Sequence, residues 1–151
     1  MKKKVFMACM LLLLVSLLAL GKSNFFGSIK GTEYVFEESE IHSLDEIQDA
    51  MKVAKRSFVL KSGGYHLDKL LYDKDKNYKA VENIDLHKDA HEPNFEIEDV
   101  IILNFEVTLL NPRMAERRGV TYDEHGNSDD FEWTLYQNES GHWVLYNYRD
   151  V

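Results

Sequence analysis

The side chains of this sequence that could do chemistry are carboxylate, amide and hydroxyl groups at every second position of its expected strands. Residues at every second position of a strand point to the same face of a sheet. Tyrosine has an apolar ring and a polar tip, so tyrosines beside amide and carboxylate groups suit a half-solvated cavity. We therefore predict a ligand-binding surface that consists of Asn104, Glu106, Thr134, Tyr136, Tyr146 and Tyr148. The same residue types also occupy the ordinary solvent-facing side of an antiparallel sheet, and the sequence leaves both interpretations open.

Within this set, Glu106 could be a catalytic residue instead of a ligand-binding one. A carboxyl group that is buried in a sheet beside tyrosines has a raised pKa and can act as a general acid or base. The sequence offers no second catalytic partner for it, no G-x-S-x-G motif and no phosphate-binding glycine loop. We therefore assign no catalytic residue and keep an enzyme that uses Glu106 as the alternative.

Two further patterns could hold a metal ion. His87 and His91 are four residues apart, which on a helix places both imidazoles on one face. They lack an H-E-x-x-H context or a third ligand of clear type. The segment from Asp123 to Asp130 alternates oxygen donors as a calcium loop does, but it has no glycine at the sixth position, and Thr134 stands where a bidentate glutamate belongs. We predict no metal site and no cofactor.

The last strands form a predicted β-hairpin within "FEWTLYQNESGHWVLYNY", residues 131–148. Glu139-Ser140-Gly141 suits a three-residue loop with Gly141 in the left-handed conformation. This loop pairs Leu135 with Leu145 and Tyr136 with Val144, which places both tryptophans on the core face. A four-residue loop would instead set Trp133 opposite Tyr146 and mix the two faces.

The most clearly specified helix begins at Ser43. Ser43-Leu44-Asp45-Glu46 is a capping box, in which the serine oxygen accepts from the Glu46 amide and the Glu46 side chain returns to the Ser43 amide. Apolar residues then recur at helical spacing until Lys61-Ser62-Gly63-Gly64 ends the helix. The expected buried stripe consists of Ile47, Ala50, Met51, Ala54 and Phe58.

The remaining elements are a strand over 65–73, a weaker helix over 78–91 that ends at Pro93, and a long strand over 98–110. The odd positions of the long strand are all apolar, so one of its faces belongs to the core and the other is partly solvated. A long connection over 111–130 leads to the hairpin. The order predicts an α+β fold, in which the helices pack on one face of a curved, mainly antiparallel four-stranded sheet.

The N-terminal segment indicates export. Three lysines precede an apolar run, and Ala19-Leu20-Gly21 suits cleavage by a signal peptidase. The run also approaches the length of a membrane anchor, so residues 1–21 are either a signal peptide or an anchor. Residues 22–42 are expected to be a tether with a short strand at Glu33–Phe36, and residues 43–151 one domain. The only cysteine, Cys9, lies inside the apolar run, so disulfides and thiolate metal sites are excluded from the exported part.

The charge of the chain excludes one class of partner. Removing the three lysines at positions 2–4 from the formal net charge of −8 leaves −11, because no acidic residue precedes Glu33. A surface of this sign repels nucleic acids and anionic lipid headgroups. We predict that the protein does not bind DNA or RNA.

Three stretches carry a resemblance to a known group of proteins: "GGYHLDKLLYDKDKN" (63–77), "LLNP" (109–112) and "DDFEWTLYQNESGHWVLYNY" (129–148). In this order after a capped helix, they resemble uncharacterised exported or lipoprotein-type domains of Gram-positive bacteria with an NTF2-like, cystatin-like α+β roll. The resemblance implies a fold, in which a bent sheet cradles a long helix, and a compartment outside the cytoplasm. It implies no functional residues, and this chain departs from the lipoprotein-type members because it lacks a suitable lipidated cysteine.

The sequence therefore predicts an exported or membrane-tethered binding module of the bacterial cell envelope. Its partner would be a small molecule, a peptide or an envelope protein, with the membrane as a further partner if the N-terminal segment is not cleaved. Two alternatives are an NTF2-like enzyme that uses Glu106 and a structural accessory protein of an envelope assembly.

Overall fold

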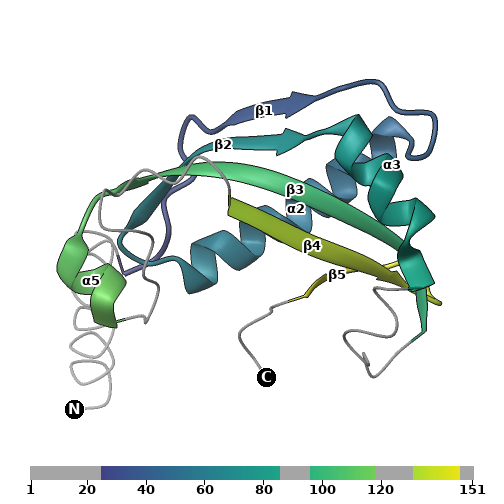
Figure 1. The fold of residues 1–151 in the computed structure, drawn as a ribbon. Coiled ribbons are helices and arrows are strands. Elements are labelled where there is room, and N and C mark those ends of the chain that lie inside the picture. The colour runs from purple at the N-terminus through teal and green to yellow at the C-terminus, as the bar shows by residue number, and fades with distance from the viewer. Residues whose placement is uncertain (1–24, 86–95, 118–130, 147–151) are drawn as a thin grey trace, which may run out of the picture.

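A computed structural model describes residues 25–85, 96–117 and 131–146 of the chain (Figure 1). Its elements in chain order are β1 (Glu33–Phe36), α2 (Leu44–Lys61), β2 (Tyr65–Tyr72), α3 (Lys74–Glu82), β3 (Ile97–Leu109), α5 (Pro112–Arg117), β4 (Phe131–Asn138) and β5 (Trp143–Tyr146). The strands form one sheet in the order β1-β2-β3-β4-β5, with β1 parallel to β2 and the other neighbours antiparallel. The α+β class is confirmed. The expected count of four strands is wrong, because β1 adds a fifth, parallel strand.

Helix α2 begins with the capping box that its sequence predicts. Ser43 Oγ accepts from the Glu46 amide at 3.3 Å, and the Glu46 carboxylate accepts from the Ser43 amide at 2.7 Å. At the other end, the Ser62 amide donates to the Phe58 carbonyl at 2.9 Å. All five residues of the expected stripe are buried: Ile47, Ala50, Met51, Ala54 and Phe58. The helix lies across one face of the sheet and covers the main core (Figure 1).

The turn after α2 depends on Gly64. Its φ is +92°, and a Cβ atom there would lie 2.7 Å from both the Asn111 carbonyl oxygen and the Ala115 amide nitrogen. The Gly64 carbonyl accepts from the amides of Leu110 and Asn111 at 2.8 and 2.9 Å. This close approach holds the start of the 111–130 connection, where α5 forms, against the turn. The rest of the connection lies outside the described residues.

Strand β2 contains a β-bulge that changes which of its residues face the core. Its pairing with β3 shifts between Leu67 and Lys69, so Asp68 is the extra residue. An extra residue reverses the alternation of faces along a strand. Leu67 and Leu70 are therefore both fully buried on the core face, although one is at an odd and the other at an even position.

Helix α3 differs from the prediction in both its start and its position. It begins at Lys74, because Asp73 acts as its N-cap and accepts from the Lys76 amide at 3.0 Å. We expected the charged residues 74–77 to precede a helix at Tyr78, but Tyr78 is 59% exposed and does not anchor it. The helix also ends earlier than predicted, at Glu82, with Asn83 as its C-cap. Residues 86–91 of the expected helix lie outside the described residues.

A second apolar cluster forms under α3, on the face of the sheet opposite α2 (Figure 1). Its buried residues are Ala80, Ile97, Val100 and Tyr136, and the partly buried residues Val81, Ile84, Ile102 and Tyr146 pack against them. The expectation that all helices pack on one face of the sheet is therefore wrong. The sheet is covered by α2 on one face and by α3 over part of the other.

The segment before α2 is bonded to the rest of the fold from Gly27 onward. The Gly27 amide donates to the Val59 carbonyl at 2.9 Å, and Ser28 forms a β-bridge with His66. The buried Thr32 hydroxyl donates to the Leu67 carbonyl at 2.7 Å. The described part of the expected tether thus packs against the domain, and its expected strand at Glu33–Phe36 is present as β1. The expected signal peptide or anchor, residues 1–21, lies outside the described residues, and none of the described helices is long and apolar enough to span a membrane.

Candidate functional site

The pairing of the hairpin agrees with the sequence. Leu135 pairs with Leu145 and Tyr136 with Val144, and Gly141 has a φ of +75°. Trp143 belongs to the core cluster on the α2 face, and Trp133 packs against the same cluster. The indoles therefore lie on the predicted face, and the even positions of β4 and β5 form the opposite surface.

That opposite surface does not expose all of the predicted ligand residues. Tyr136 has no exposed surface and belongs to the second apolar cluster, which also contains Ala80 of α3. Its ring centroid lies 5.4 Å from that of Tyr146, which is only partly buried. Burial, with a smaller contribution from Tyr146, raises the pKa of Tyr136 to about 12. Thr134 is half-buried opposite Tyr146, and Tyr148 lies outside the described residues.

The other predicted ligand residues lie further along the same face and are paired with neighbours. Lys76 Nζ donates to Asn104 Oδ1 at 3.0 Å and also pairs with Glu132. Lys69 Nζ donates to a Glu106 carboxylate oxygen at 3.2 Å, and the Glu106 side chain is 54% exposed. The structure thus separates the buried Tyr136 from the solvated Glu106. The part of the surface around Asn104 and Glu106 is a solvated sheet face that carries the ion pairs Lys69–Glu106 and Lys76–Glu132.

No metal site is visible in the part of the chain that the structure describes, because no three potential ligands gather there. Both sequence patterns for metal binding, His87 with His91 and Asp123–Asp130, lie outside the described residues.

A buried polar chain that the sequence did not reveal joins four residues. His42 is 2% exposed, and its Nδ1 lies 2.7 Å from the Tyr72 hydroxyl, while its Nε2 lies 3.2 Å from the Asp99 carboxylate. The Tyr72 hydroxyl lies 2.9 Å from Ser39 Oγ. Burial raises the pKa of Tyr72, although the Ser39 hydrogen bond acts in the opposite direction. We refer to Ser39, His42, Tyr72 and Asp99 as the buried polar chain.

A histidine between a carboxylate and a hydroxyl group is an arrangement that enzymes use for proton transfer. Here the imidazole and the Tyr72 ring are closed off from solvent, so a substrate cannot reach them. Ser39 Oγ also accepts from the amides of Ile41 and His42, at 3.2 and 3.3 Å. The arrangement instead fixes the segment that crosses from β1 to α2 to strand β2 through Tyr72 and to strand β3 through Asp99. No short motif could have revealed it, because Asp99 is 57 residues from His42 in the sequence.

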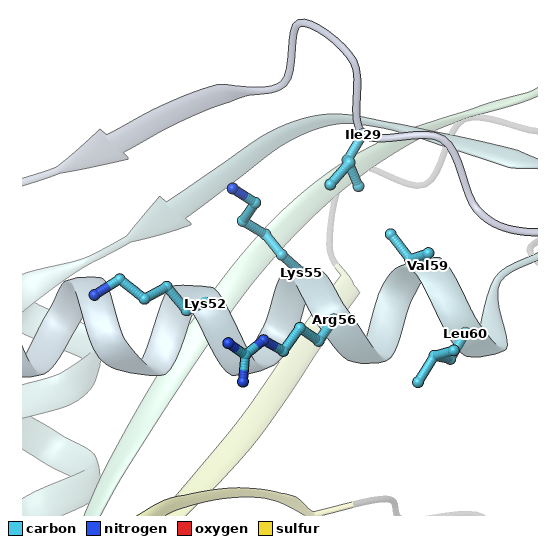
Figure 2. Close-up of a pocket in the computed structure, with 6 residues that line it drawn as sticks. All are labelled: Ile29, Lys52, Lys55, Arg56, Val59 and Leu60. Carbon is cyan, nitrogen blue, oxygen red and sulfur yellow. The ribbon is translucent and has the colours of Figure 1, made fainter.

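A groove on the outer side of α2 is the second feature that the sequence did not reveal. It has a volume of about 450 Å³ and lies between α2 and the segment before β1. Figure 2 shows its lining, which consists of Ile29, Lys52, Lys55, Arg56, Val59 and Leu60. The cations come from the middle turns of α2, and the apolar side chains come from its last turn and from Ile29. We refer to this feature as the α2 groove.

The cations of the α2 groove differ in how they are engaged. Lys52 Nζ donates to Asp49 at 2.7 Å in an exposed pair, and Lys55 Nζ lies 4.8 Å from the centre of the Tyr34 ring. Arg56 is exposed and has no hydrogen bond or ion pair with any residue that the structure describes. Leu60 is 61% exposed. An uncommitted guanidinium group beside exposed apolar surface can bind an anion that carries an apolar part.

Comparison of the chain with models of protein families, with curated proteins and with solved structures finds no match in any of the three.

Proposed function

We propose that this protein is a non-catalytic binding module that acts outside the cytoplasm, released or held at the membrane by its N-terminal segment, and that it binds an anionic partner in the α2 groove. The observation that carries the proposal is the gathering of Lys52, Lys55 and Arg56 beside exposed apolar side chains. The chain as a whole has a net charge of −8, so the local cluster of three cations is opposite in sign to the charge of the whole chain. Its export is the expectation from the lysine-led apolar run at positions 1–21.

Two features of the described residues favour a binding module over the enzyme alternative. Glu106 is exposed and paired with Lys69, so it does not lie in an enclosed site that could hold a substrate against it. The histidine of the buried polar chain has no access to a substrate. We further propose that the domain is a variant of the NTF2-like roll, in which α2 is the cradled helix and β1 is an addition.

The proposal is tested with anilinonaphthalene sulfonate, a fluorescent probe that is both anionic and apolar. The folded full-length chain should bind it saturably, with an increase in fluorescence. The double variant Lys52→Glu/Arg56→Glu should weaken this binding by about tenfold or more, because charge-assisted hydrogen bonds to the sulfonate are replaced by repulsion.

The matched control is Lys74→Glu/Lys79→Glu, which changes the net charge by the same amount on exposed positions of α3. It should bind the probe as the unmodified chain does. Urea unfolding must show that both double variants are folded, because partly unfolded proteins also bind this probe. Equal binding by the two double variants, or no saturable binding by the unmodified chain, would refute a role of the α2 groove.

A further inference from the structure

We infer that the α2 groove is a site for one single-chain anionic amphiphile, a molecule with a carboxylate or phosphate head on an unbranched acyl or alkyl tail. The inference rests on the proposed function and adds the chemical class of the ligand. It depends on the order in which charged and apolar side chains follow one another along α2 (Figure 2).

The head of the ligand would lie at the cationic end of the groove. Arg56 presents a planar guanidinium group that can donate two parallel hydrogen bonds to a carboxylate or phosphate. It has no partner among the described residues, so no existing bond must be broken. Among the described residues Lys52 pairs with the exposed Asp49, and exposed pairs of this kind are worth about 1 kcal/mol or less. Both side chains can therefore turn to an incoming anion at small cost.

The tail would lie over the apolar end. Val59 and Leu60 belong to the last turn of α2. Figure 2 shows that Val59 points toward Ile29 of the segment before β1, whereas Leu60 points away from Ile29 at the other edge of the groove. The Gly27 amide, which donates to the Val59 carbonyl at 2.9 Å, keeps that segment against the helix. From Lys52 to Leu60 the helix rises about 12 Å, which matches the full length of an extended amphiphile of about ten carbons with its head group included. Covering the exposed Leu60 supplies the hydrophobic contribution.

The charge distribution favours a free amphiphile over the surface of an anionic membrane. An extended anionic surface would meet the whole of the acidic chain, whose repulsion acts over about 8 Å at physiological ionic strength. A single small molecule meets only the local field of the three cations. The groove is also polarised along the helix, with charge at one end and apolar surface at the other, and this is the polarity of one amphiphile lying lengthwise.

The test is a calorimetric titration of the full-length chain with monomeric decanoate. We expect one saturable site. Arg56→Glu should weaken binding by about tenfold or more, and Leu60→Gln by severalfold. The matched controls are Lys79→Glu for the charge and Leu44→Gln for the apolar side chain, since Leu44 is 49% exposed at the opposite end of the same helix. Both controls should bind as the unmodified chain does. All variants keep residues 1–24, so any affinity of that segment for decanoate is common to them.

The choice of ligand determines what each outcome means. Hexanoate should bind more weakly, by up to about fourfold for each methylene removed, and the uncharged decyl glucoside should bind at least tenfold more weakly than decanoate. Equal binding of decanoate and decyl glucoside would overturn the inference, and so would binding to anionic lipid vesicles without binding to monomeric decanoate. If the sulfonate probe depends on Lys52 and Arg56 but decanoate does not bind, this inference fails while the proposed function stands. If neither ligand binds, both fail.

Discussion

The side-chain amide of Asn77 makes both backbone hydrogen bonds of Ile102. Its Nδ2 donates to the Ile102 carbonyl at 2.9 Å, and its Oδ1 accepts from the Ile102 amide at 2.7 Å. The last residue of β2, Tyr72, pairs with Leu103, so β2 has ended where its next residue would pair with Ile102. The Asn77 side chain takes the place of that missing strand residue beside β3. It also ties the first turn of α3 to the middle of the sheet.

We predict that Asn77→Ala destabilises the protein by about 1–3 kcal/mol, because it leaves the partly buried amide and carbonyl of Ile102 without their partner. Asn77 has no exposed surface, so water cannot replace the amide without rearrangement. Urea unfolding measures the loss, and hydrogen exchange at the Ile102 amide should accelerate specifically. Asn83→Ala is the control on the same helix, because Asn83 is exposed and bonds only to its own last turn. A loss below about 0.5 kcal/mol for Asn77→Ala would mean that the hydrogen bonds between Asn77 and Ile102 do not contribute to the stability of the protein.

The buried Tyr136 predicts a loss of stability at alkaline pH. Its pKa is raised from 10.0 to about 12, so the folded protein keeps the phenol proton where the unfolded chain releases it. The contribution of this proton to the free energy of unfolding is complete below pH 10. It is lost as the pH rises from 10 through 12, by roughly 1.4 kcal/mol for each pH unit.

Tyr136→Phe removes this titration, so its stability should fall less steeply than that of the unmodified chain between pH 10 and 12. The slopes are compared, since the substitution also changes the stability at neutral pH. Tyr78→Phe, at an exposed position, should retain the original slope. Identical slopes for Tyr136→Phe and the unmodified chain would show that Tyr136 titrates normally.

The buried polar chain predicts a second sensitive position. Tyr72→Phe removes the hydroxyl group that lies 2.7 Å from His42 Nδ1, and it leaves that nitrogen buried without its partner. We expect a loss of about 1–3 kcal/mol in the free energy of unfolding. Tyr34→Phe, at a partly exposed position on β1, should change stability by less than about 0.5 kcal/mol. If the two substitutions had equal effects, the chain of hydrogen bonds would not stabilise the fold.

For Glu106 we predict that replacement by glutamine has little effect. The exposed pair with Lys69 is worth about 1 kcal/mol or less, so Glu106→Gln should leave both stability and probe binding near those of the unmodified chain. Thermal unfolding and fluorescence titration measure the two quantities. A change of several kcal/mol, or a loss of binding, would return Glu106 to the centre of the functional site.

Several parts of this molecule could be predicted from short stretches of sequence. The capping box at Ser43 and the apolar stripe specify α2, and the alternation over 98–110 specifies the core face of β3. Gly141 specifies the register of the hairpin, because its left-handed conformation fits a three-residue loop. Each of these depends on residues within a few turns or on one strand pair, where geometry leaves one solution.

The candidate sites could not be predicted in the same way. Whether Tyr136 is solvated depends on where α3 lies, and whether Leu67 and Leu70 share a face depends on a bulge that carries no sequence signature. The α2 groove exists because Ile29, expected in a tether, packs beside the last turn of α2. Local sequence sets which face of an element is apolar, because the period of the backbone is fixed. Which elements then cover that face is decided by contacts between distant segments, which only the assembled tertiary structure contains.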